Sequence, residues 1–295
     1  MTKGQPTMNE AGQRGLLVIL LLALSACRAS EAPRPTVQTQ TNEQGCVRVR
    51  STRPQDPAAI PVPMKQACVG PYLLELPQNY FYNQMGTEFD GSFALALEYP
   101  SLEPFKPGER SNLKADMVTR TVVVTYDFIS GISAYQAMRN FHTPSERGQA
   151  DPRKSFDSRI EGAPIYNLTP YYADMPRIRD YMRAAGISDG APGAQARWNT
   201  DWFVRRGTNG EVETMITCTS RDVVDSGVAY VDGKMVKMKG SPAPECTHHF
   251  LLPDFRTMAT VHYVRVGLAD WERIEERART IFLKNIRTMK NDSQQ

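Results

Sequence analysis

Residues 202–218 have the sequence WFVRRGTNGEVETMITC, and this stretch decides the fold. Two apolar, β-branched runs, Trp202 to Arg206 and Val212 to Cys218, flank the dipeptide Asn209-Gly210. Asn and Gly tolerate the positive φ angles of tight hairpin turns, so Asn-Gly between apolar runs is the strongest short-range signal for a β-hairpin. The stretch therefore predicts two adjacent antiparallel strands.

Further strands are predicted on both sides of this hairpin. Asp232-Gly233 stands between two short apolar runs, residues 228–231 and 234–238, and predicts a second hairpin. Alternating apolar and β-branched residues predict the remaining strands, over residues 72–76, 93–99, 116–129, 246–252 and 258–266.

Helical spacing and end signals mark three segments, residues 131–141, 174–186 and 270–289. Ser133, Asp174 and Asp270 are their candidate N-caps, because a short polar side chain can accept a hydrogen bond from the first helical turn. The last segment carries an apolar stripe and predicts a C-terminal amphipathic helix.

The fold class expected from these elements is α+β, an antiparallel β-sheet meander with packed helices. Residues 142–165 are polar and contain several Gly and Pro, which is typical of a loop or a boundary. We therefore expect two lobes of similar size, an N-terminal α+β lobe over 64–150 and a C-terminal α+β lobe over 165–290.

The N-terminus has the pattern of a secretion signal. Basic residues precede the apolar run Leu16 to Leu24, which is too short to span a bilayer but suits a signal peptide over residues 1–26. The following Leu24-Ser25-Ala26-Cys27 resembles a bacterial lipobox, which implies that Cys27 is acylated. An ordinary signal peptide with a chance Cys is the alternative. Three acyl chains would anchor the protein stably in the envelope, facing the periplasm.

The residues after the lipobox cysteine indicate how the protein is held at the membrane. Arg28 follows the cysteine and no Asp stands there to suggest retention at the inner membrane, which favours the outer membrane. Residues 27–63 are rich in Pro, Thr, Gln and Arg and lack apolar periodicity. This composition predicts a flexible tether.

Composition excludes several function classes. Apolar residues make up 41% and charged residues 23% of the chain, as in an ordinary globular protein. The net charge of +3, from 35 basic and 32 acidic residues, argues against a nucleic-acid partner. The N-terminal run is the one stretch apolar enough to meet a membrane, so a multi-span transporter is excluded.

Cysteine usage agrees with an oxidising compartment. Without Cys27, an even set remains, Cys46, Cys68, Cys218 and Cys246. Four cysteines allow three pairings, of which the sequence-local one joins neighbours along the chain. Each such disulfide would contribute about 3 kcal/mol in the chain-entropy model. The alternative is that some of these cysteines remain buried free thiols.

Motifs for catalysis, cofactors or metals are not convincing. The segment Gly227 to Lys234 has one residue too many for a phosphate loop, and Ser133 lacks the second glycine of a nucleophile elbow. Cys246, His248, His249 and His262 are metal-ligand types. However, consecutive strand residues point to opposite faces, which separates the two adjacent histidines. We assign no catalytic, cofactor or metal site.

A family resemblance rests on phrases spread over residues 65–285. They are Ala67-Cys68-Val69-Gly70-Pro71-Tyr72, Leu74-Glu75-Leu76-Pro77, Leu168-Thr169-Pro170-Tyr171-Tyr172, Asp201-Trp202-Phe203, Ile216-Thr217-Cys218, Cys246-Thr247-His248-His249-Phe250-Leu251-Leu252-Pro253 and Trp271-Glu272-Arg273-Ile274-Glu275. In this order they resemble proteobacterial lipoproteins encoded beside type VI secretion effectors. The neighbouring effectors are typically lipases or phospholipases, and the lipoproteins look like their immunity proteins.

Three functions follow as hypotheses. The resemblance implies a non-enzymatic immunity protein whose partner is a secreted lipase-type effector. A non-catalytic envelope lipoprotein, acting as a scaffold or assembly factor, is the alternative, and a periplasmic hydrolase with scattered site residues is the third. Interface hot spots are commonly Trp, Tyr and Arg. By residue type the candidates are Tyr171, Tyr172, Trp198 and Trp202.

Overall fold

The structure of the chain is a computed structural model that describes residues 37–287, apart from residues 53, 88–92, 146, 147, 149, 224, 225, 233 and 241. The predicted signal peptide (1–26), the predicted acylation site Cys27 and the first part of the predicted tether lie outside the described residues. Among the helices of the described part, none has the length and apolar character that crossing a bilayer requires.

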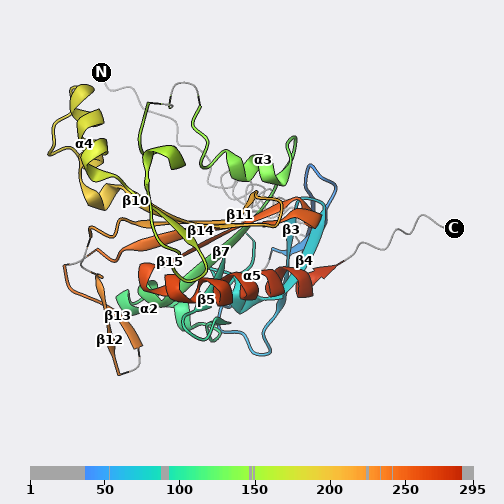
Figure 1. Ribbon diagram of the computed structural model, residues 1–295. Helices are drawn as coiled ribbons and strands as arrows, with labels where there is room; N and C mark the ends of the chain where they lie inside the picture. The colour runs from blue at the N-terminus through green and yellow to red at the C-terminus, as the bar shows by residue number, and fades with distance from the viewer. Residues whose placement is uncertain are drawn as a thin grey trace, which may run out of the picture.

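A nine-stranded antiparallel sheet forms the centre of the molecule (Figure 1), in the order β6-β5-β7-β15-β14-β11-β10-β9-β8. Its strands are β5 (Leu95–Glu98), β6 (Glu103–Pro104), β7 (Thr121–Phe128), β8 (Ile160–Glu161), β9 (Thr169–Tyr172), β10 (Thr200–Arg206), β11 (Val212–Thr219), β14 (Glu245–Leu252) and β15 (Thr257–Val264). The hairpin predicted from Asn209-Gly210 is confirmed as the β10–β11 pair, in which Trp202 lies opposite Thr217. The α+β prediction is confirmed.

Smaller sheets and helices surround this sheet. One small sheet has the order β16-β4-β3, and two hairpins are β1–β2 and β12–β13. These strands are β1 (Val37–Thr41), β2 (Val47–Ser51), β3 (Met64–Val69), β4 (Tyr72–Pro77), β12 (Val228–Val231), β13 (Lys234–Lys237) and β16 (Ile286–Arg287). The helices of the described residues are α2 (Ala115–Arg120), α3 (Ala134–Arg139), α4 (Met175–Ala184) and α5 (Trp271–Asn285).

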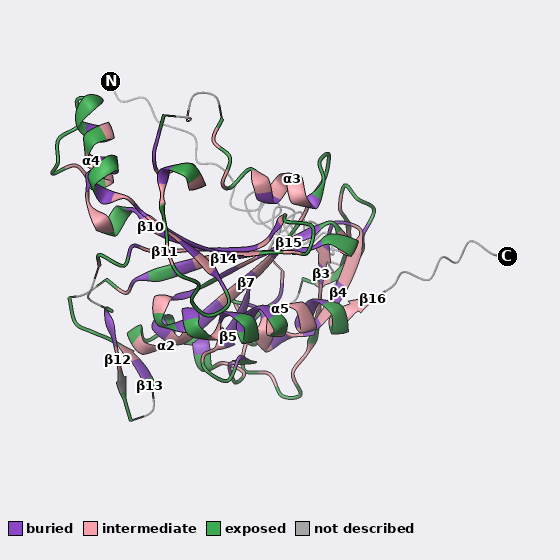
Figure 2. Cartoon of the chain, viewed as in Figure 1, coloured by how far each residue is buried: buried purple, intermediate pink, exposed green. Residues whose placement is uncertain are grey.

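Helix α5 covers one face of the large sheet, and its inward side is buried (Figures 1 and 2). Its apolar stripe packs on side chains of β7, β14 and β15, and β3 and β4 add to the same core. The buried stripe residues are Trp271, Ile274, Ala278, Ile281 and Phe282. Each such large side chain contributes about 1.5–3 kcal/mol when buried. The predicted C-terminal amphipathic helix is therefore present and forms one wall of the core.

The predicted N-caps have different outcomes. Ser133 accepts a hydrogen bond from the backbone N–H of Gln136, and Asp174 accepts one from Arg177, so both cap their helices. Asp270 precedes α5 but makes no capping bond. Its carboxylate accepts a hydrogen bond from the Tyr99 hydroxyl at 2.7 Å instead. Tertiary contact therefore outcompetes the local cap at this position.

Two expected boundaries differ from the structure. The predicted tether over 27–63 contains the β1–β2 hairpin, which the Cys46–Cys68 disulfide fastens to β3. The two predicted lobes share one sheet, because β7 of the first pairs with β15 of the second. Sequence composition around the polar segment indicated a boundary, but long-range strand pairing crosses it.

The predicted strand over 116–129 is wrong in its first part, which is helix α2. Met117 is buried with Ala96 and Phe105, and Val118 is exposed. The Thr121 hydroxyl donates a hydrogen bond to the Met117 carbonyl, which closes the last turn. The even spacing from Val118 to Val122 continues the two-residue period of the strand that follows, although Val118 belongs to the helix.

A buried carboxylate joins α5 to the sheet. Glu275 is 2% exposed and lies within the apolar stripe of the helix. It accepts hydrogen bonds from the guanidinium groups of Arg205 and Arg279, at 2.9 and 2.7 Å. It also accepts from the Thr214 hydroxyl at 2.8 Å and lies 3.0 Å from Nε2 of His248. Every donor but Arg279 comes from the sheet, so this carboxylate fixes where the helix sits.

The charge states of this cluster follow from its surroundings. Burial alone would raise the pKa of the Glu275 carboxyl, but the His248 hydrogen bond and the cations of Arg279 and Arg205 bring it well below its usual range. Burial lowers the pKa of His248. A neutral imidazole with its proton on Nε2 therefore donates to an ionised carboxylate.

Replacing Glu275 with Ala is expected to lower the free energy of unfolding by about 3–5 kcal/mol, because the Arg205 and Arg279 cations lose their buried counter-charge. Urea denaturation followed by circular dichroism measures this. The matched control is Glu276→Ala, one residue further along and exposed, with an expected change within about 0.5 kcal/mol. Equal losses in the two variants would contradict a stabilising role for the buried carboxylate.

Candidate functional site

The histidines singled out in the sequence do not converge. His248 is fully buried and faces α5, and His249 lies on the other face, where its ring stacks on Phe141 with centroids 4.3 Å apart. His262 is exposed, with Nδ1 3.2 Å from the Thr247 hydroxyl. The predicted opposite orientation of the two adjacent histidines is confirmed. Within the residues the structure describes, no group of three or more metal-ligand side chains could hold an ion.

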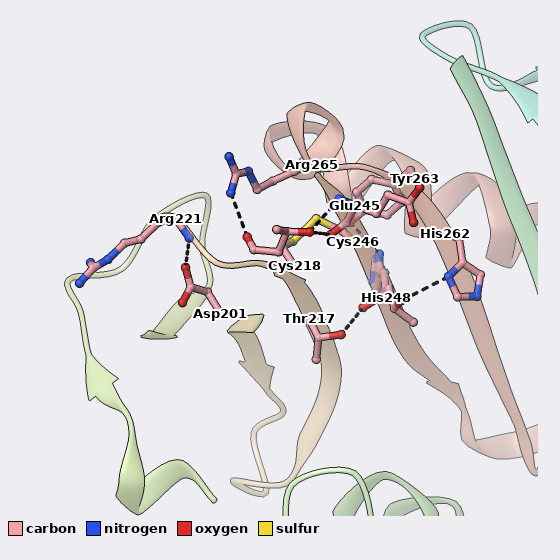
Figure 3. The surroundings of a disulfide bond; sticks show 12 residues. Asp201, Thr217, Cys218, Arg221, Glu245, Cys246, His248, His262, Tyr263 and Arg265 are labelled. Atoms are coloured by element: carbon pink, nitrogen blue, oxygen red, sulfur yellow. Dashed lines mark hydrogen bonds between the residues drawn. A yellow bond between two sulfur atoms is a disulfide. The ribbon is translucent and has the colours of Figure 1, made fainter. Parts of the chain in front are cut away.

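The other ligand type, cysteine, is engaged in disulfides. The structure contains Cys46–Cys68 and Cys218–Cys246, the sequence-local pairing. Cys218 and Cys246 are direct partners on β11 and β14. The second disulfide therefore joins two central strands of the large sheet, close to one end of each strand (Figure 3). This end of the sheet is also where a helical protrusion is attached.

That protrusion, residues 173–199, connects β9 to β10 and is called the α4 arm. Figure 1 shows α4 (yellow) standing away from the end of the sheet. The arm has a small apolar core of its own, made by Ala173, Met175, Ile178 and Met182 with Tyr181 and Ala196 packed against it. A local core of this kind lets the arm keep its shape although it contributes little to the main core.

Asp201 fastens both ends of the arm. Its carboxylate is 1% exposed and accepts hydrogen bonds from the backbone N–H of Ala173 at 2.9 Å and of Arg221 at 2.6 Å. Figure 3 shows the hydrogen bond from Arg221 to Asp201, near the Cys218–Cys246 disulfide. Burial raises the pKa of Asp201, although the two hydrogen bonds oppose the shift. Arg265 strengthens the same corner by donating to the carbonyl oxygens of Thr219 and Ser220.

A second support is Arg159, whose guanidinium lies 3.6 Å from the ring centre of Trp202. It donates to the carbonyl oxygens of Thr200 at 2.6 Å and Arg153 at 2.9 Å. Burial lowers the pKa of Arg159 to about 10, which leaves it cationic at neutral pH. The base of the arm is therefore held by a buried carboxylate, Asp201, and by the half-buried cation of Arg159.

The four candidate hot-spot residues have different surroundings. Trp202 is 4% exposed beneath Arg159, so it belongs to the core. Tyr171 and Tyr172 are half-buried, the second beneath the Arg221 guanidinium. Trp198 alone among the four is exposed, and it lies at the base of the arm.

Sequence reasoning missed Asp201 and Glu275, although each had a detectable signal. Asp201 lies two residues before Phe203 in the same strand, so the two side chains face the same side of the sheet. A charged side chain on the side of a core phenylalanine is a signal that can be read from the sequence. Glu275 stands between Ile274 and Ala278 on the apolar stripe of the last helix. A charge placed on a buried face requires partners, but the identity of those partners depends on the tertiary fold.

Comparison with known proteins adds a likeness of fold. No family model matches the chain. No curated protein matches it. Among solved structures it is similar to Smlt3025, described as an immunity protein of the Stenotrophomonas maltophilia type IV secretion system, with a TM-score of 0.66. The chain has the fold of this immunity protein. The likeness covers 85% of this chain and 99% of Smlt3025 at 21% identity.

Replacing Asp201 with Ala is expected to lower the free energy of unfolding by about 2–4 kcal/mol, because the buried N–H of Ala173 and the part-buried N–H of Arg221 lose their acceptor. Amide hydrogen exchange at Ala173 and along the arm should also accelerate. The control is Asp222→Ala, an exposed carboxylate nearby, which should behave as wild type. Unchanged exchange in the Asp201 variant would mean that the arm is held by other contacts.

Acid should destabilise the fold through His249. Burial first, and then the charges of His248 and His262, lower its pKa to about 4. The unfolded chain takes up this proton near pH 6.5, so stability falls as pH drops from about 6.5 to 4, by about 3 kcal/mol. Urea midpoints across this range measure the slope.

The variant His249→Gln should show a shallower loss over the same interval. The comparison is His262→Gln, an exposed imidazole on the adjacent strand, which removes only the last and smallest cause of the lowered pKa of His249 and should therefore reduce the loss of stability much less. If the urea midpoint of the His249→Gln variant falls with pH as steeply as that of the wild type, other groups cause the acid sensitivity.

Proposed function

We propose that this chain is an immunity protein that faces the periplasm on a lipid anchor at Cys27. In this proposal it binds a secreted effector stoichiometrically and neutralises it without catalysing a reaction. The observation that carries the proposal is the likeness of fold to a secretion-system immunity protein over 85% of the chain. The two disulfides agree with an oxidising compartment.

The class of effector is the finer part of the proposal. The sequence phrases resemble lipoproteins encoded beside type VI lipases and phospholipases, whereas Smlt3025 is described as part of a type IV system. Both descriptions have in common an immunity protein associated with a secretion system. We infer a lipase-type effector, whose active-site mouth or lid this chain would cover.

Neutralisation by covering a site needs a rigid surface and no reactive group. Rigidity comes from the nine-stranded sheet, from the disulfide across β11 and β14, and from the Glu275 cluster beneath. A rigid surface loses little conformational entropy when it binds, which favours slow dissociation. These features support tight binding but not a particular effector.

The test is a protection experiment. The product of the gene adjacent to this chain's own gene is directed to the periplasm of a Gram-negative host, with and without the full chain. We expect growth arrest by the product alone, restored growth when the chain is present, and a one-to-one complex of the purified proteins. In the same host, wild-type chain should fractionate with membranes and the Cys27→Ala variant should not.

Two outcomes would contradict the proposal. A toxic neighbour that the chain neither binds nor counteracts would remove the immunity function. A harmless neighbour, together with stable association of the chain with envelope-assembly proteins, would favour the alternative of a scaffold lipoprotein. If the Cys27→Ala variant still fractionates with membranes, the lipid anchor at Cys27 is contradicted, but the proposed immunity function is not.

A further inference from the structure

We propose that the turn at residues 195–199, at the base of the α4 arm, anchors the effector interface. Trp198 would enter an apolar slot on the partner protein, and Arg197 would pair with a carboxylate at the rim of that slot. This inference rests on the proposed function and adds to it the surface and the chemistry of the partner.

Exposure of Trp198 is the first observation. Its side chain is 62% exposed, more than any other Phe, Tyr or Trp that the structure describes. The other two tryptophans, Trp202 and Trp271, are 4% and 1% exposed. A large aromatic left in water gains free energy when a partner covers it, since transfer from water stabilises apolar area by about 25 cal/mol per Å².

The turn that presents Trp198 is held rigidly, which is the second observation. Asn199 is 4% exposed, and its side-chain amide donates to the carbonyl oxygens of Gly193 at 3.0 Å and Gln195 at 2.8 Å. The Asn199 carbonyl accepts from the backbone N–H of Ser220 at 2.9 Å. Next along the chain comes Asp201, which fastens the arm. The exposed indole therefore stands on a preorganised base, as an interface hot spot requires.

The direction of the turn is set by Ala196, the third observation. Residues 196–198 form a single 3-10 turn in which Ala196 packs on the arm core. Successive residues of such a turn point about 120° apart. With Ala196 facing inward, Arg197 and Trp198 face solvent, and both are exposed. Both side chains are thus exposed to solvent from adjacent positions of one turn.

Charge gives the chemistry of the partner. Among the residues that the structure describes, Arg197 forms no hydrogen bond or ion pair, and its side chain is exposed. Two other arginines of the arm are engaged, since Arg177 donates to the Asp157 carbonyl and Arg183 pairs with Asp180. Arg179 has no printed partner either, but it is half-buried, whereas Arg197 is exposed beside Trp198. A partner that complements the pair has an apolar slot beside a carboxylate, because a guanidinium binds carboxylates with two parallel hydrogen bonds.

The experiment measures binding of the purified product of the adjacent gene to the full chain. Trp198→Ala is expected to raise the dissociation constant by at least about 30-fold, which is the range of an interface hot spot. Trp198→Phe should recover part of the loss, and Arg197→Ala should weaken binding about 5-fold to 10-fold with a reduced dependence on salt. The unfolding midpoint should stay unchanged in all three, because both side chains are exposed.

The matched control is Leu113→Ala, another exposed apolar side chain, at 51%, which lines a groove distant in sequence beside Tyr82 and Val118. It should bind as wild type does. Wild-type affinity in Trp198→Ala, with binding lost in Leu113→Ala instead, would overturn the inference and leave the immunity function intact. Absence of binding by the wild-type chain to a toxic neighbour would overturn both.

Discussion

The carboxylate of Glu275 is the constraint on which the packing of this protein depends. A charge buried at the interface of helix and sheet is stable only when nearly every lone pair is used, and here Arg205, Arg279, Thr214 and His248 use them. Apolar stripes alone would let α5 slide or rotate on the sheet. The directed hydrogen bonds select one position, and the strands beneath must keep their register to supply the donors.

The same arrangement recurs at the edge of the sheet. Asp201 uses a buried carboxylate to hold backbone N–H groups from two separate loops, and Arg159 uses a half-buried cation to hold backbone carbonyls. The central sheet is thus rigid where it supports the arm, and the arm is free of the core where it meets solvent. That division agrees with the proposed binding function.

Local signals in the sequence predicted the hairpins, the caps at Ser133 and Asp174, and the C-terminal helix, because turn chemistry and apolar spacing act over a few residues. They failed at α2, where burial of Met117 decides, and at the boundary between lobes, where β7 pairs with β15 across more than a hundred residues. Residue type alone suggested four aromatic residues as candidate interface contacts. In the structure Trp198 is the exposed one of the four. Asp201 and Glu275 could be suspected from strand and helix parity, but their partners could not.

With the proposed lipid anchor at Cys27, the β1–β2 hairpin would limit how far the folded part can lie from a membrane. With β1 beginning at Val37, only nine residues separate it from Cys27. At about 3.5 Å per residue, a chain anchored at that cysteine can place Val37 no more than about 35 Å from the lipid surface. The folded part of the protein would therefore stay in a shallow layer next to the bilayer. An enzyme that attacks lipids must enter the same layer to reach its substrate.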